Sequence, residues 1–161
     1  MCLVHDFGKG LTPRDKLPAH IGHDINGVKV AKEFLERLKA PAKMINHAEK
    51  CTRYHMAGHR LNQMNPKTFV KMFDELNILN DPDITILLYR VFCCDHRGRL
   101  GSETESIDHL TIFLDYANAY KSVKFADVFP NGENNPNKIK DGMMTARIQA
   151  VKTVKEHKDD Y

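Results

Sequence analysis

Residues 27–39 have the sequence GVKVAKEFLERLK, and this stretch decides the fold. Its apolar side chains recur at Val28, Ala31, Phe34, Leu35 and Leu38. A spacing of three or four positions places apolar side chains on one face of an α-helix, whereas a half-buried strand alternates at every second residue. We therefore predict a helix here, with its apolar face turned toward the protein interior.

Helix start signals recur along most of the chain. Pro41 marks the start of a helix that continues through MINHAEKCTRYH toward Gly58. Asn65-Pro66 places an N-cap residue before a proline at the first helical position. Further helices are expected from about Asp81-Pro82-Asp83 through ITILLYRVFCCD, from Ser106, and over residues 138–157. No segment indicates a convincing strand, so we predict an all-α protein.

The remaining segments predict one domain. Residues 1–7 have the pattern of a helix end that Gly8 and Gly10 stop, and residues 8–24 and 123–137 are expected to be loops. A length of 161 residues fits a single domain with its own core. We assign residues 1–122 to the body of a helical bundle and residues 123–161 to a loop and the closing C-terminal helix of the same domain.

Composition excludes several classes of protein. No apolar run reaches the roughly 18 residues that a membrane span needs, so we expect a cytoplasmic protein without membrane contact. A net charge of +3 permits contact with phosphates without requiring it. The 4 cysteines include no C-x-x-C pair, and we expect them to be reduced and mostly buried.

Histidine is the unusual feature of the composition, because six of the 9 histidines lie before residue 60. Candidate metal ligands stand in four places: His5-Asp6, His20 with His23, His55 with His59, and Asp95. In a helical bundle such groups need a partner inside an apolar interior, and a divalent metal is the strongest one. His55 and His59 are four positions apart, which is one turn of an α-helix, so both are expected to reach the same point.

Each of these features also has an ordinary structural explanation. A histidine pair at this spacing is often surface decoration, a His-Asp dipeptide arises by chance, and Asp95 is also consistent with a helix cap. Their joint order, with His-Asp first, paired histidines next and an aspartate last, is much less expected by chance. The combination therefore favours a metal site.

The order H-D, H, H, D in a helical domain resembles the signature of the HD phosphohydrolase superfamily. The strings HDFGKGLTP, PAHIGHDINGV, YHMAGHRLNQMNPKTFVKMFD and CCDHRGRLG resemble, more closely, the C-terminal HD domain of bacterial CCA-adding tRNA nucleotidyltransferases. The resemblance runs along nearly the whole chain and is weakest after about residue 105. It implies a metal-dependent phosphatase with 2′,3′-cyclic phosphodiesterase and 2′-nucleotidase activity. The nucleotidyltransferase head has no counterpart here, so CCA addition is not expected.

The resemblance also implies roles for single residues. It implies metal binding by His5, Asp6, Asp95, His20, His23, His55 and His59. It implies catalytic roles for Lys9, His20, His23, His55 and His59, and phosphate binding by Lys9, Arg97 and Arg99. The implied cofactor is one or two divalent ions of Ni, Mn, Co or Mg.

The chain departs from the family pattern at two places. The arginine that the family often has before the first loop histidine is Ala19, and the upstream helix that carries a further metal-binding histidine has no counterpart before Met1. Three explanations stay open: the remaining ligands suffice, His20, His23 or a neighbouring subunit substitutes, or the site binds without catalysis. Without that helix, apolar surface beside residues 1–7 would be exposed, and we expect a homodimer to cover it.

We expect a phosphohydrolase that acts on 2′,3′-cyclic or terminal phosphates of nucleotides or RNA 3′-ends. The alternative is a nucleotide- or RNA-binding protein that is non-catalytic or that degrades cyclic-nucleotide signals, for example a viral protein that acts against such signals.

Overall fold

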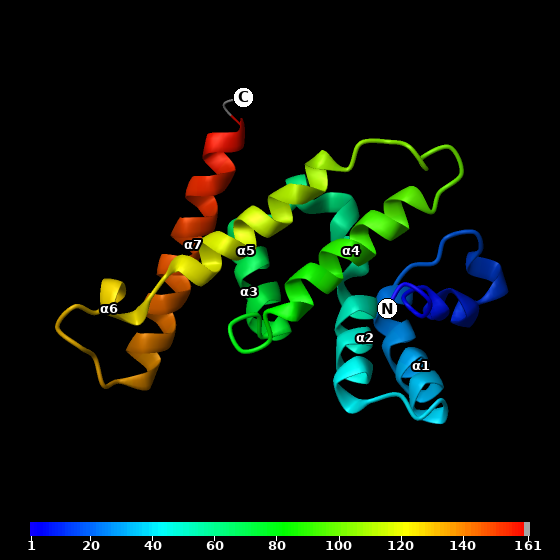
Figure 1. The fold of residues 1–161 in the computed structure, drawn as a ribbon, viewed down its shortest axis with the longest axis horizontal. Coiled ribbons are helices and arrows are strands. Elements are labelled where there is room, and N and C mark those ends of the chain that lie inside the picture. Colours follow the sequence, from blue (N-terminus) through cyan, green and yellow to red (C-terminus); the bar gives the residue numbers. More distant parts are fainter. Residues whose placement is uncertain (160–161) are drawn as a thin grey trace. The chain divides into compact units, whose positions relative to one another are not determined.

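The helix predicted around residues 27–39 is α1, which spans His23–Arg37 in a computed structural model of the chain (Figure 1). The structure describes residues 1–159, and residues 160–161, at the end of the predicted segment 123–161, lie outside the described part. Within residues 1–159 there are seven α-helices, four 3₁₀-helices and no β-strand, so the all-α prediction is confirmed. None of these helices is long and apolar enough to cross a lipid bilayer.

Most of the other helices begin within about two residues of the predicted starts, but the helix expected from Ser106 begins only at Ile112, and the helix expected to continue toward Gly58 ends at Tyr54. The α-helices after α1 are α2 (Ala42–Tyr54), α3 (Pro66–Leu76), α4 (Asp83–Arg97), α5 (Ile112–Ser122), α6 (Phe125–Val128) and α7 (Pro136–Asp159). The 3₁₀-helices are η1 (Phe7–Leu11), η2 (Arg14–Lys16), η3 (His55–Gln63) and η4 (Asp108–Thr111). The Asn65 side chain accepts a hydrogen bond from the Thr68 backbone N–H at 2.9 Å, which is the N-cap contact that the sequence predicts.

The prediction for the N-terminal residues is wrong. Residues 1–6 form successive turns, and Gly8 lies inside η1 instead of stopping a helix. Gly8 is needed for a close approach, because a Cβ at this position would lie 2.0 Å from the backbone oxygen of His23. The predicted loops also contain short helices, since η2 and all of η1 except Phe7 lie within residues 8–24, and α6 lies within residues 123–137.

The cysteines differ from the prediction in burial. All four are free thiols, but Cys51 alone is buried, and its pKa is raised to about 12 by burial. Cys2 and Cys94 are exposed, and Cys93 is half-buried.

The chain divides into two units. Unit 1 contains residues 1–60 and 86–110, and unit 2 contains residues 61–85 and 111–161. In unit 1, α1 and α2 lie side by side (Figure 1). Small side chains make this possible, because Ala31 of α1 and Ala48 of α2 are fully buried and form a cluster with Val4. Met1, Phe7, Phe34 and Leu35 pack around this cluster. The N-terminal turns are therefore part of the apolar core of unit 1.

Unit 2 has an aromatic core between α3, α5 and α7. Phe69 and Tyr116 meet edge to face at 4.6 Å between ring centroids, and Phe73 contacts both Phe113 and Tyr120. All five of these aromatic residues are fully or almost fully buried. Edge-to-face packing of this kind adds specific geometry to the burial of apolar area.

Candidate metal centre

Tight turns at the N-terminus hold the His5-Asp6 dyad. The backbone N–H of Val4 donates to the Met1 carbonyl at 3.1 Å, and that of Lys9 donates to the Asp6 carbonyl at 2.9 Å. The Val4 side chain is only 1% exposed and anchors these turns in the core of unit 1. The backbone of the His5-Asp6 dyad is therefore held in place by hydrogen bonds and core packing, although the dyad lies close to Met1.

A backbone contact between η1 and α1 brings the dyad to His23. Gly8 and Gly27 meet without side chains between them, since a Cβ on Gly27 would lie 2.9 Å from the Gly8 nitrogen. At this separation Asp6 Oδ1 lies 3.2 Å from Nε2 of His23, the first residue of α1. The same oxygen lies 3.5 Å from Nε2 of His55, the first residue of η3. Three segments that are distant in sequence thus supply one cluster.

Three histidines of this cluster are oriented in the same way. Each Nδ1 lies within hydrogen-bond distance of the backbone carbonyl three residues earlier: His5 to Cys2 at 2.6 Å, His23 to His20 at 2.6 Å, and His55 to Thr52 at 2.7 Å. A carbonyl oxygen only accepts hydrogen bonds, so each Nδ1 must carry the proton. In the neutral ring, Nε2 then carries a free lone pair. Metal-binding histidines typically have this arrangement, with the second ring nitrogen donating to a carbonyl or carboxylate.

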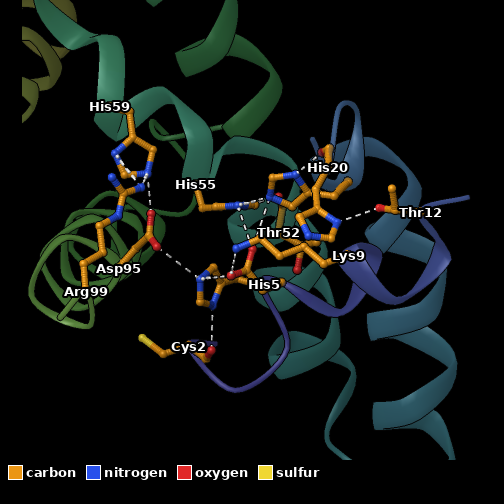
Figure 2. A network of polar contacts seen from close by, with 12 residues as sticks. Cys2, His5, Lys9, Thr12, His20, Thr52, His55, His59, Asp95 and Arg99 are labelled. Carbon is orange, nitrogen blue, oxygen red and sulfur yellow. Dashed lines mark hydrogen bonds and ion pairs between the residues drawn. The ribbon is translucent and has the colours of Figure 1, made fainter. Parts of the chain in front are cut away.

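The Nε2 atoms that carry these lone pairs lie close together, and Figure 2 shows His5 and His55 in this polar network. Nε2 of His23 and Nε2 of His55 are 3.0 Å apart, and two acceptor atoms at this distance repel unless a proton or a cation lies between them. His5 Nε2 and Asp6 Oδ1 are buried and have no hydrogen-bond partner. Ligand atoms of His5, Asp6 and His55 all lie within 4.8 Å of one another. The donor set, imidazole nitrogens with a carboxylate oxygen, fits a divalent transition metal.

A second polar group lies beside this cluster, on α4 and the loop that follows it. Asp95 Oδ2 lies 2.5 Å from Nε2 of His59, and Arg99 Nη2 lies 2.9 Å from the same nitrogen. The other carboxylate oxygen, Asp95 Oδ1, lies 3.7 Å from His5 Nε2 (Figure 2). Asp95 stands in the last turn of α4, where the helix dipole disfavours a negative charge. Its position is therefore stabilised by the neighbouring histidines.

The pKa shifts show where positive charge is favoured. The Asp95 carboxylate, 3.7 Å from Nε2, raises the pKa of His5, although burial opposes this. Burial acts to raise the pKa of Asp6 and of Asp95. Burial is the largest single influence at each carboxyl, but Lys9, His5 and His55 together outweigh it at Asp6. His5 and His59 together outweigh it at Asp95, so both pKa values are lowered. Burial lowers the pKa of His55. The two carboxylates therefore stay ionised and attract a cation to the space around His5.

Packing of η3 on α4 within unit 1 fixes the second group. Gly58 approaches the Phe92 ring so closely that a Cβ on Gly58 would lie 2.7 Å from a ring carbon. Phe92 is 2% exposed and lies one turn before Asp95. This contact determines the distance between His59 and Asp95.

The structure assigns different partners to the histidines that were expected to share one point. His55 contacts Asp6 and His23, whereas His59 contacts Asp95 and Arg99. The reason is that α2 ends at Tyr54, so both histidines lie in a 3₁₀-helix. Three residues complete a 3₁₀ turn, so positions four apart point in different directions.

The other predicted site residues have distinct positions. The His20 ring bonds Thr12 Oγ1 at 2.8 Å through Nδ1, and its backbone carbonyl orients His23. Lys9 Nζ lies 2.5 Å from Asp6 Oδ2, so it neutralises one carboxylate oxygen. Arg97 is exposed at the end of α4. The orienting carbonyls of Cys2 and Thr52 were not predicted, because every residue has a backbone carbonyl and the sequence does not distinguish these two.

Comparison with known proteins identifies the family of the chain. The family model described as "HD domain" matches residues 1–121. The Multifunctional CCA protein of Actinobacillus pleuropneumoniae serotype 5b (strain L20) is 33% identical over 153 residues, which cover 95% of this chain and 37% of that protein. The Multifunctional CCA protein of Aliivibrio salmonicida is 34% identical over 92% of this chain and 36% of its own length. That of Pseudomonas fluorescens Pf-5 is 30% identical over 96% and 38%.

The chain thus spans little more than a third of the length of these relatives. No solved structure matches it. The family match and the relatives confirm the resemblance that the sequence motifs indicated.

Proposed function

We propose that this chain, which belongs to the HD domain family, is a metal-dependent phosphohydrolase that acts on 2′,3′-cyclic or terminal phosphates of nucleotides or RNA ends. Membership of the family supports metal-dependent hydrolysis in general terms, and the relatives associate such a domain with multifunctional CCA proteins. The substrate class rests on the resemblance and on the cationic groups around the centre.

One observation carries the proposal. The Nε2 atoms of His23 and His55 face each other at 3.0 Å, and the buried His5 Nε2 and Asp6 Oδ1 lie beside them without a hydrogen-bond partner. An arrangement of acceptors without donors is unfavourable in a protein interior unless a cation occupies it. We infer that these four residues hold a divalent metal, and that Asp95 extends the donor set on the other side of His5.

A divalent cation in such a centre makes water more acidic and polarises a phosphoryl oxygen. The chain itself supplies the remaining groups. Arg99 offers guanidinium N–H groups, which suit bidentate contact with a phosphate, and Lys9 adds a second positive charge. His59, whose Nε2 lies 2.5 Å from Asp95 Oδ2, places an imidazole beside Arg99, and an imidazole is a common general acid for a leaving oxygen.

Metal analysis and a substrate screen test the proposal. The purified protein is stripped, reloaded with Ni²⁺, Mn²⁺, Co²⁺ or Mg²⁺, and assayed with bis-para-nitrophenyl phosphate and 2′,3′-cyclic AMP. We expect turnover that depends on the metal and that falls by about 10³-fold or more in Asp6→Asn and His55→Asn, because both remove a ligand. Matched controls are Asp127→Asn, an exposed aspartate in unit 2, and His109→Asn, whose ring packs on His96.

Nucleotide binding without turnover would contradict the proposed hydrolase activity. If the metal-loaded protein binds nucleotides but turns over neither substrate with any of the four ions, the chain is a sequestering module. Equal turnover in Asp6→Asn and in the unchanged protein would also contradict the proposed ligand set.

A further inference from the structure

A cavity of about 170 Å³ lies next to the metal centre in unit 1. His23 belongs to both places, since it lines the cavity and its Nε2 lies 3.2 Å from Asp6. Gly8, two residues after Asp6, also lines the cavity. The cavity and the metal centre are therefore adjacent, with His23 between them.

Aliphatic side chains form much of the cavity wall. Leu11 is the last residue of η1 and Pro13 follows it, and Ala19 and Ile21 come from the segment before α1. Leu11 is 54% exposed and Ile21 is 90% exposed, although burial would stabilise both. Large apolar side chains that gather around an open cavity are typical of a ligand site.

The size of the cavity matches one aromatic ring. An engineered protein cavity of about 150 Å³ binds benzene. The volume here, about 170 Å³, therefore accommodates a six-membered ring with its small substituents. A fused two-ring system would extend beyond the aliphatic walls and bury less of its surface.

The polar groups of the cavity are few and of a suitable kind. Thr12 and Asn26 contribute a hydroxyl and an amide, each of which both donates and accepts hydrogen bonds. Lys16 adds one cation at the rim. The carbonyl, ring nitrogen and amino group of a nucleobase need such partners. Small numbers of polar groups in an apolar pocket typically fix the orientation of a ligand.

We propose that this cavity is a base subsite that binds the single ring of a pyrimidine nucleotide whose phosphate lies at the metal centre. The proposal rests on the proposed function for the position of the phosphate. It adds a preference: a pyrimidine is bound about tenfold more tightly than a purine, because misfit in an apolar pocket typically changes discrimination by 10-fold or more.

Calorimetry with cytidine 3′-monophosphate, adenosine 3′-monophosphate and inorganic phosphate tests this subsite on the metal-loaded protein. Ala19→Phe fills the cavity, and Ile21→Ser removes an exposed aliphatic wall without burying a polar group. The matched control is Leu38→Ser, which changes an aliphatic residue that is 59% exposed in unit 1 and does not line the cavity. Circular dichroism checks the fold of each variant.

We expect Ala19→Phe to weaken cytidine 3′-monophosphate binding by at least about tenfold and Ile21→Ser by about threefold, with phosphate binding unchanged. Leu38→Ser should change neither. If Ala19→Phe does not fold, the Ile21→Ser result decides. Unchanged nucleotide binding in the folded variants, or an equal loss of phosphate binding, would overturn the subsite.

The failure of the subsite and the failure of the hydrolase are distinguishable. If phosphate binds but cytidine 3′-monophosphate does not, the proposed subsite is wrong and the proposed metal centre is retained. If Ala19→Phe weakens nucleotide binding but the protein shows no turnover, the proposed subsite is supported and the proposed hydrolase activity is wrong. If neither phosphate nor cytidine 3′-monophosphate binds, both the subsite and the hydrolase proposals are wrong.

Discussion

Both units of this protein contain a cluster of interacting polar side chains, and the two clusters differ in whether donors meet acceptors. In unit 2, the Tyr120 hydroxyl donates to Asp74, and Arg147 Nη1 forms an ion pair with the same carboxylate at 3.4 Å. The Arg147 guanidinium also lies over the Tyr120 ring, 4.4 Å from its centroid. In unit 1, the Nε2 atoms of His23 and His55 face each other and Asp6 as acceptors.

The difference distinguishes a cluster that pairs donors with an acceptor from one that we propose binds a metal. In the unit 2 cluster, donors from Tyr120 and Arg147 meet one carboxylate, so we call it the closed cluster, although the buried Arg147 Nε has no hydrogen-bond partner within residues 1–159. Burial and the hydrogen bond to Asp74 raise the pKa of Tyr120. Matched groups of this kind position α3, α5 and α7. The unit 1 cluster has acceptors in excess, and a cation is what would match them. The following predictions test this contrast.

The largest expected effect distinguishes the two aspartates. Asp6→Asn should weaken Mn²⁺ or Ni²⁺ binding by about 100-fold or more, because it removes an anionic ligand between two imidazoles. Asp74→Asn should leave metal binding unchanged and lower the free energy of unfolding by about 1–3 kcal/mol. Metal titration and urea unfolding of both variants provide the measurement. If Asp6→Asn binds metal as tightly as the unchanged protein, the proposed difference between the two clusters is wrong.

A glycine pair tests the backbone contact that brings Asp6 to His23. Gly8→Ala should destabilise unit 1 by about 1–3 kcal/mol and weaken metal binding, because its Cβ would collide with the His23 carbonyl. Gly10→Ala is the matched control, since a Cβ on Gly10 meets nothing within 4 Å. Thermal unfolding with and without Mn²⁺ measures both effects. If Gly8→Ala and Gly10→Ala have the same stability and metal affinity, the close contact at Gly8 is not needed to position Asp6 beside His23.

Acidity should weaken metal binding through His5. Its pKa is raised above 6.5, so below neutral pH a proton competes with the metal for Nε2. The pKa values of Asp6, Asp95 and His55 are lowered, so these groups stay in their metal-binding forms down to lower pH. The affinity should fall by about tenfold between about pH 7.5 and 5.5, with release of close to one proton per ion. Calorimetry in two buffers of different ionisation enthalpy counts the protons. A pH-independent affinity over this range would contradict the role of His5.

The smallest effect belongs to the closed cluster. Tyr120→Phe should cost about 1 kcal/mol of stability, since it removes one hydrogen bond and retains the packed ring. Metal binding in unit 1 should stay unchanged. Chemical denaturation together with a Ni²⁺ titration checks both statements. A loss of metal affinity in this variant would show that the unit 2 cluster is not purely structural.

Much of the fold follows from local sequence rules. The apolar period in residues 27–39 and the Asn65-Pro66 start both predict helices that the structure contains. The error at residues 1–7 has a physical reason, because Gly8 makes a close backbone approach that resembles a helix stop in sequence. Local patterns do not reveal which distant backbone a glycine will touch.

The site was predicted in kind but not in arrangement. The residue types at His5, Asp6 and Asp95 indicate metal binding, and unit 1 brings all three together. The separate partners of His55 and His59 depend on a change from α- to 3₁₀-helix at residue 55, which the residue spacing does not encode. Three backbone carbonyls hold the proton on Nδ1 of the histidines and so leave a lone pair on each Nε2. A pattern of side chains does not predict these backbone contacts.

Nitrogen-15 NMR of the histidine rings tests the central claim most directly. At about pH 8.5, above the ordinary histidine pKa, the metal-free protein should show His5, His23 and His55 with the proton on Nδ1. Addition of Zn²⁺, a diamagnetic stand-in, should shift all three Nε2 resonances and leave those of His109 unchanged. A proton on Nε2 in these rings, or spectra that Zn²⁺ does not change, would contradict the account.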